Sequence, residues 1–242
     1  MSTLITLGCS FTLGQGCYGD LDISKIDIEK YPYYSLHKDD FLSGSIGRNL
    51  QEHYGYETYY NYAQGGASNE SQLLMFFRNQ DQIDIDDDNV VVLWQGTFPW
   101  REFCVTEKVA DAVPFNLIEQ RMKFRYDFEN TSPEDDIMRE SILYFNVMKE
   151  YCKARGWKFF IWFWEQNHND YRRLSHMLND NIIPISFELN NTSDISFEGH
   201  PNEIGYKTVS DSLIEGISNS TFSFPHPNET PKVMKQIDND TI

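Results

Sequence analysis

Short apolar runs alternate along this chain with segments of helical periodicity, and this alternation limits the folds that are open to it. Four runs have the length and composition of buried strands, and they span residues 3–8, 57–61, 90–94 and 158–164. Residues 182–187 form a shorter fifth candidate. Since strands that alternate with helices pair in parallel and bury both faces, the pattern predicts an α/β fold with a covered parallel sheet.

The segments between the strands carry helix signals. Apolar residues recur with a helical period in residues 41–54 and again after Asn69. Residues 132–155 open on Ser-Pro-Glu-Asp, a typical helix start, and a last helix follows residues 200–206. With 242 residues the chain fits one large domain, which we expect to span residues 1–218.

Two segments lack such patterns. Residues 98–131 interleave aromatic with basic side chains, which favours a lid or an insertion that packs on a partner. Residues 219–242 are polar and rich in Asn and Pro, and we expect them to form a C-terminal tail. Either segment could carry a contact with a protein partner or with a second copy of the chain.

The formal net charge of −17 opposes binding to nucleic acid or to an anionic membrane, because both need a basic protein face. No signal peptide and no membrane-spanning run is recognisable, so we expect a soluble, cytoplasmic protein, with a place in a larger particle left open. The four cysteines show no Cys-x-x-Cys spacing, and no metal-ligand or nucleotide-binding motif occurs. We therefore expect reduced thiols, no metal and no cofactor.

The first strand ends at Gly8-Cys9-Ser10, which places the Ser10 hydroxyl at the carboxyl edge of the sheet. In open α/β sheets that edge is where ligands bind. An ordinary turn with Ser10 as a helix N-cap explains the same residues, so the motif gains weight only from partners elsewhere. Along a strand the Cys9 side chain should point away from Ser10, and we interpret Cys9 as a small buried residue.

Two further glycine turns follow strands, and His200 stands just before the last helix. In this order the motifs resemble those of the SGNH/GDSL hydrolases, a family of esterases and lipases. The three matching segments are Gly8-Cys9-Ser10-Phe11-Thr12, Asn61-Tyr62-Ala63-Gln64-Gly65-Gly66-Ala67-Ser68 and Phe197-Glu198-Gly199-His200-Pro201-Asn202. The resemblance spans residues 3–217 and implies a three-layer α/β/α sandwich with a mainly parallel, flavodoxin-like sheet.

The resemblance also implies the roles of a serine ester hydrolase. Ser10 would attack an ester carbonyl, His200 would take its proton, and Glu198 would orient the imidazole, with Asp194 as an alternative acid. The expected oxyanion hole consists of the backbone N–H groups of Ser10 and Gly66 and the amide of Gln95. The expected wall of the substrate site consists of Asn69, Thr97, Trp100 and Arg101.

The chain departs from the family pattern at three positions. Cys9 replaces the aspartate of the first block, and the acid at Glu198 lies two rather than three residues before His200. Phe98 replaces the third-block asparagine, which donates to the oxyanion. Loss of one such donor typically costs about 10²–10³-fold in turnover unless another group substitutes, and Gln95 has a suitable amide.

Two functions are compatible with these residues. The first is hydrolysis of a small acyl ester, with an O-acetylated carbohydrate as the expected substrate class. The alternative is a catalytically weak or inactive domain of the same fold, used for binding or as a structural component of a larger assembly, because a fold can persist after its site has decayed.

Overall fold

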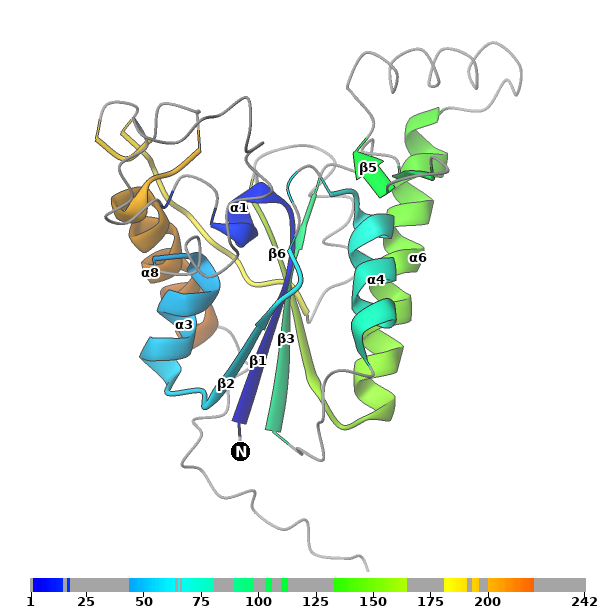
Figure 1. Cartoon of the computed structure of the whole chain (residues 1–242), viewed down its shortest axis with the longest axis horizontal. Coiled ribbons are helices and arrows are strands. Elements are labelled where there is room, and N and C mark those ends of the chain that lie inside the picture. Colours follow the sequence, from blue (N-terminus) through cyan, green and yellow to red (C-terminus); the bar gives the residue numbers. More distant parts are fainter. Residues whose placement is uncertain are drawn as a thin grey trace, which may run out of the picture.

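A computed structural model of the chain describes residues 2–14, 17, 44–63, 65, 67–80, 89–97, 103–105, 110–112, 133–164, 181–190, 193–195 and 200–219. The core of this part is a sheet of four parallel strands in the order β2-β1-β3-β6 (Figure 1). The strands are β1 (Ser2–Leu7), β2 (Thr58–Asn61), β3 (Asn89–Gly96) and β6 (Lys158–Phe163). The four apolar runs that were predicted to be strands are confirmed.

The two central strands are paired on both sides. Leu4 of β1 is in register with Tyr59 of β2 and with Val91 of β3, and Leu93 of β3 is in register with Phe160 of β6. After its first residue β3 is buried throughout. Burial on both faces explains why its sequence is a continuous apolar run rather than an alternating one.

Helices cover both faces of the sheet, so the fold has three layers (Figure 1). On one face lie α1 (Ser10–Leu13), α3 (Ile46–Tyr54) and α8 (Glu203–Asn219), and on the other lie α4 (Asn69–Asn79) and α6 (Pro133–Ala154). Val91 packs in the apolar cluster beneath α3 and α8, whereas Val92 packs in the cluster beneath α4 and α6. The predicted three-layer α/β/α sandwich with a parallel sheet is confirmed.

The start of α3 differs from the prediction. Its periodicity suggested a start at residue 41, but Ser45 caps the helix by accepting a hydrogen bond from the Arg48 N–H at 3.3 Å. The helix therefore begins at Ile46, and residues 41–43 lie outside the described part. It ends at Gly55, whose φ of 72° is a left-handed conformation that glycine adopts without strain.

The predicted fifth strand at residues 182–187 is wrong. Ile182 forms one isolated bridge to β6, and the pairing stops there. Pro184 has no N–H to continue the ladder. Ser186 instead pairs with Ser212 of α8, donating its N–H to the Ser212 hydroxyl at 3.0 Å and accepting from that hydroxyl at 2.8 Å. The segment is thus an extended connection that is bound to a helix rather than to the sheet.

The segment 98–131 contains an antiparallel pair that the sequence did not predict, β4 (Phe103–Val105) and β5 (Ala110–Ala112). The rest of the expected lid lies outside the described residues, as does the expected tail from residue 220 onward. Among the described helices, none combines the length and the apolar composition needed to cross a membrane.

Candidate active site

β1 and β3 are neighbours in the sheet, but the helices that the structure describes after them lie in different layers. β1 leads into α1 on the α3 and α8 face, whereas the next described helix after β3, α6, lies on the opposite face (Figure 1). Such a switch point leaves a crevice beyond the carboxyl ends of the two strands, and ligands bind there in open α/β folds. Ser10 follows β1 and Gln95 lies near the end of β3, so both lie at this edge of the sheet.

Ser10 is the first residue of α1 and is 7% exposed. The N-cap position of α1 is occupied by Cys9, so the alternative interpretation of Ser10 as a capping serine is wrong. The turn from β1 into α1 is so tight that a Cβ at Gly8 would collide with the side chain of Thr12. Glycine at position 8 is therefore what allows the serine to follow the strand directly.

His200 and Ser10 lie in hydrogen-bond contact. The distance between His200 Nε2 and Ser10 Oγ is 2.9 Å, although the two residues are 190 positions apart in the chain. In the tautomer with a bare Nε2, the serine hydroxyl donates to the imidazole, which is the arrangement that a general base needs. The fold therefore brings a serine hydroxyl and an imidazole together from opposite ends of the described chain.

The residues around His200 are held by Asn202. Its side-chain Nδ2 donates to the Ser193 carbonyl at 2.7 Å, and its backbone N–H donates to the Asp194 carbonyl at 2.9 Å. Its Oδ1 accepts two N–H groups of the first turn of α8, at 3.0 and 3.1 Å. Asn202 thus caps α8 and ties it to the preceding turn, which limits the movement of His200.

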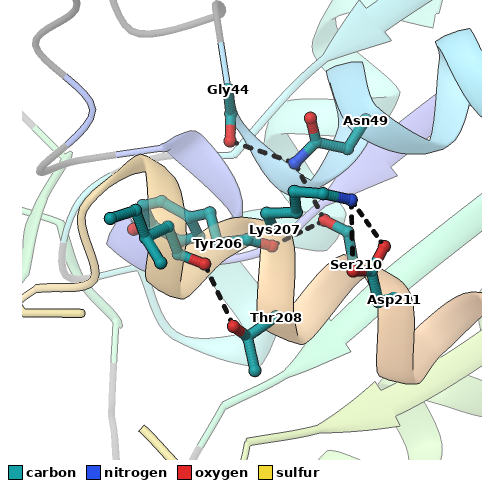
Figure 2. A network of polar contacts seen from close by, with 8 residues as sticks. Gly44, Asn49, Tyr206, Lys207, Thr208, Ser210 and Asp211 are labelled. Atoms are coloured by element: carbon teal, nitrogen blue, oxygen red, sulfur yellow. Dashed lines mark hydrogen bonds and ion pairs between the residues drawn. The ribbon is translucent and has the colours of Figure 1, made fainter. Parts of the chain in front are cut away.

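α8 is in turn in contact with α1, which carries Ser10, and with α3. The Tyr206 hydroxyl lies 3.5 Å from the Ser10 carbonyl, and the Tyr206 carbonyl accepts a hydrogen bond from Ser210 Oγ at 2.7 Å. Figure 2 shows how this continues into α3, where Asn49 Nδ2 donates to Ser210 Oγ at 3.1 Å and to the Gly44 carbonyl at 3.2 Å. These contacts keep the elements that carry Ser10 and His200 in one block.

Gln95 is 1% exposed, and its carboxamide has a defined orientation. Its Oε1 accepts a hydrogen bond from Thr12 Oγ1 at 2.6 Å and a longer one from Cys9 Sγ at 3.5 Å. Because the oxygen is bound on the α1 side, the donor half of the amide, Nε2, is the part that remains for other acceptors. The role of Thr12 was missed by sequence reasoning, since a contact between positions 83 residues apart leaves no local pattern.

Two of the expected wall residues form a buried clasp instead of a surface. Asn69 Oδ1 accepts from the Thr97 N–H at 2.9 Å and from Thr97 Oγ1 at 3.2 Å, while Asn69 Nδ2 donates to the Thr97 carbonyl at 3.1 Å. The same Nδ2 lies 3.3 Å from Ser141 Oγ on α6. Asn69 is only 2% exposed. Its hydrogen bonds to Thr97 therefore position the chain that follows β3.

We expect replacement of Asn69 by alanine to lower the free energy of unfolding by about 3 kcal/mol, because the Thr97 N–H and hydroxyl would stay buried without their acceptor. Denaturant unfolding measures this. The control is Asn49→Ala, which removes two side-chain hydrogen bonds, against four for Asn69→Ala, and does so at a half-buried site where water can replace them. Equal losses in the two variants would contradict the assigned role of the clasp.

Four expected site residues, Gly66, Trp100, Arg101 and Glu198, lie outside the described residues. The alternative acid, Asp194, is described. Its carboxylate accepts the Asn190 N–H at 2.8 Å and the Ser193 hydroxyl at 2.6 Å, and these bonds lower the pKa of Asp194 below its ordinary value. Both carboxylate oxygens are therefore used inside its own turn, which gives no support to Asp194 as the acid that orients His200.

Thiol chemistry is not favoured at Cys17 and Cys152. Cys9, Cys17 and Cys152 are free and buried. Burial raises the pKa of Cys17 to about 12, with a smaller contribution from the Glu203 carboxylate, and burial also raises the pKa of Cys152 to about 12. These two thiols are protonated at neutral pH and are poor nucleophiles. Within the described ranges, no group of three His, Cys, Asp or Glu residues could hold a metal ion.

No protein-family model matches the sequence, and no curated protein matches it significantly. Solved structures do match. The acetyl xylan esterase Est2A from the rumen bacterium Butyrivibrio proteoclasticus is similar with a TM-score of 0.54 at 10% sequence identity, over 90% of this chain and 64% of that chain. The chain shares the fold of this esterase. A lipase from a goat rumen metagenome has a TM-score of 0.49 at 14% identity, over 89% of this chain and 97% of that chain.

A sequence identity of 10% to the acetyl xylan esterase establishes the shared architecture and not the chemistry. The chain also spans only 64% of the length of the acetyl xylan esterase. A proposal about the reaction therefore has to come from the contacts of Ser10, His200 and Gln95 at the sheet edge.

Proposed function

We propose that this protein is a serine ester hydrolase with Ser10 as nucleophile and His200 as general base. The observation that carries the proposal is the distance of 2.9 Å between Ser10 Oγ and His200 Nε2. A serine hydroxyl is a weak nucleophile at neutral pH until an adjacent base removes its proton. An imidazole at this distance and at the crevice of an SGNH-hydrolase fold is suited to that task.

The reaction runs in two halves. As Ser10 Oγ bonds to the ester carbonyl carbon, His200 Nε2 accepts the hydroxyl proton, and it then gives this proton to the leaving alcohol oxygen as the C–O bond breaks. The acyl group remains on Ser10. In the second half, water attacks the acyl carbon, its proton passes to His200 and on to Ser10 Oγ, and the carboxylic acid leaves.

The negative charge on the carbonyl oxygen needs donors that are already in place. We assign the backbone N–H groups of Ser10 and Gly66 and the Nε2 of Gln95 to this role. Gln95 would replace the asparagine that the family has at the position of Phe98, because its Oε1 is held by Thr12 and its amide cannot rotate freely. Glu198, two residues before His200, is the proposed acid that orients the imidazole.

The proposed substrate is a small acyl ester, with an O-acetylated carbohydrate as the class. A nucleophile that is 7% exposed favours a short acyl group, since a long or branched one has little room to approach. The acetyl xylan esterase with the same fold is consistent with this class. The net charge of −17 favours uncharged over anionic substrates.

Covalent labelling tests the proposal without knowledge of the natural substrate. The full chain is incubated with an alkyl fluorophosphonate, whose phosphorus bonds to an activated serine oxygen as fluoride leaves, and the adduct is located by peptide mass spectrometry. We expect one adduct on Ser10, no adduct in Ser10→Ala, and much slower labelling in His200→Ala. Ser212→Ala, which removes a hydroxyl that binds Ser186 instead, is the control and should be labelled like the wild type.

Labelling of a different residue, or equal labelling in His200→Ala, would contradict the proposal. A folded wild-type protein in which Ser10 does not react would favour the alternative function, a domain that is retained for binding or assembly.

A further inference from the structure

A row of aromatic side chains begins beside the imidazole of His200. Phe11 lies next to His200, with ring centroids 5.2 Å apart, and stacks on Trp164 at 4.2 Å with an interplanar angle of 19°. Phe187 contacts Trp164 edge-on at 4.9 Å. We call Phe11, Trp164 and Phe187 the aromatic row.

The aromatic row is built from three separate segments. Phe11 follows the nucleophile on α1, Trp164 follows the last residue of β6, and Phe187 lies on the extended connection that is bound to α8. All three pack on the core cluster beneath α3 and α8 but remain partly exposed. Three partly exposed aromatic side chains in mutual contact form an apolar surface, and its first ring, Phe11, contacts the imidazole of His200.

The position of the aromatic row indicates which part of an ester it meets. In the proposed reaction His200 Nε2 gives its proton to the oxygen of the leaving alcohol, so that oxygen must lie on the His200 side of Ser10. The ring contacts of the row lead to His200, whereas the Gln95 amide is bound through its Oε1 to Thr12 and Cys9 at the end of β3. A row of rings that starts at the imidazole is therefore next to the alcohol part of the ester and not to its acyl part.

We propose that the aromatic row is the subsite for the alcohol part and that it selects an uncharged alcohol with a six-membered ring, either a pyranosyl or an aryl group. Both have an apolar ring body whose C–H groups or π face pack well against aromatic side chains. The net charge of −17 disfavours anionic alcohols. This inference rests on the proposed function, since it uses the direction of proton delivery by His200.

The test compares acetate esters of three alcohols: methyl β-D-xylopyranoside, phenol and ethanol. For each ester kcat and KM are measured with the wild type and with Trp164→Ala. We expect the variant to lower kcat/KM for the two ring alcohols, relative to ethyl acetate, by about 10-fold, mainly through KM. Trp164→Phe should retain most of the preference of the wild type for the esters of the ring alcohols over ethyl acetate. A loss of kcat/KM that is confined to the xyloside acetate indicates that the subsite takes a sugar ring. A loss that is confined to phenyl acetate indicates that it takes an aryl ring.

Two further variants guard against a structural explanation. Phe187→Ala removes the outer ring of the row and serves if Trp164→Ala does not fold. It should likewise lower the ratio of kcat/KM for the ring alcohols to kcat/KM for ethyl acetate. Phe77→Ala removes a half-buried aromatic side chain from α4, on the opposite face of the sheet, and should leave the ratio unchanged. An unchanged ratio in both Trp164→Ala and Phe187→Ala, or an equal change in Phe77→Ala, would overturn the inference.

Binding of the free alcohols separates this inference from the proposed function. Saturation-transfer NMR with methyl β-D-xylopyranoside and with phenol is recorded on Ser10→Ala and on Ser10→Ala/Trp164→Ala. A signal that disappears with Trp164 supports the subsite even if no ester is hydrolysed. Two results together would contradict the subsite but not the hydrolase: neither free alcohol binds to Ser10→Ala, and the Ser10-dependent kcat/KM of the wild type does not depend on whether the alcohol has a ring.

Discussion

Replacement of Ser10 by alanine is expected to lower kcat/KM for 4-nitrophenyl acetate by about 10⁴-fold, and His200→Ala should cost about as much. The physical reason is that the two side chains act as one unit: without the imidazole the hydroxyl stays protonated, and without the hydroxyl the imidazole has nothing to activate. The double variant should therefore lose no more than either single variant. Initial rates of 4-nitrophenol release measure all three.

The controls for this prediction concern folding. The Ser10 hydroxyl makes one side-chain hydrogen bond in the described structure, to His200, so Ser10→Ala should change the free energy of unfolding by only about 1 kcal/mol. Asn202→Ala, which loosens the loop around His200 without touching the reacting atoms, should lower kcat less than His200→Ala does. Additive losses in the double variant, or residual turnover equal to the wild type, would rule out a shared catalytic role.

The second large effect is expected at Gln95. Gln95→Met keeps the volume of the side chain but removes its amide donor, and we expect kcat to fall by about 10²–10³-fold with little change in KM. The fall in kcat follows because the donor acts on charge that develops only in the transition state. Steady-state kinetics with a small acetate ester separates the two constants.

Stability has to be separated from catalysis at this position, since Gln95→Met also leaves the buried Thr12 hydroxyl without its acceptor, at a cost of about 1–3 kcal/mol. Adding Thr12→Val removes that hydroxyl as well, so the double variant should regain most of the stability but none of the activity. Thr12→Val alone keeps the donor and frees its orientation, and should cost about 10-fold in kcat. Activity that returns together with stability would show that Gln95 acts only on the fold.

Much of the architecture is predictable because strands and helices are encoded by residues that are close in sequence. The run from Val90 to Trp94 predicts a buried strand, and Ser132-Pro133 predicts the start of a helix that the structure has at Pro133. The prediction failed at residues 182–187, where apolar content alone could not show that Pro184 interrupts the ladder and that Ser186 binds α8 instead.

The candidate site, like the fold, could be predicted from the sequence only in part. The local contexts of Ser10 and His200, a glycine turn after a strand and a turn before an amphipathic helix, mark both as candidates only together with the resemblance of the motifs to the SGNH/GDSL family. The same reasoning placed Asn69 and Thr97 on the substrate wall, whereas the structure buries them in a clasp between α4, the end of β3 and α6. A polar residue beside a strand end looks alike in either role, because the difference depends on which helix packs over it.

The sequence by itself determined that this chain is a layered α/β protein with a serine directly after its first strand and a histidine just before its last helix. Only the tertiary structure decided that Ser10 and His200 touch, that Thr12 holds Gln95, and that Phe11 and Trp164 stack beside the imidazole. The physical reason is that periodicity and turn chemistry are properties of neighbouring residues. Contacts between distant residues follow from the order and register of the strands, and no single segment contains that information.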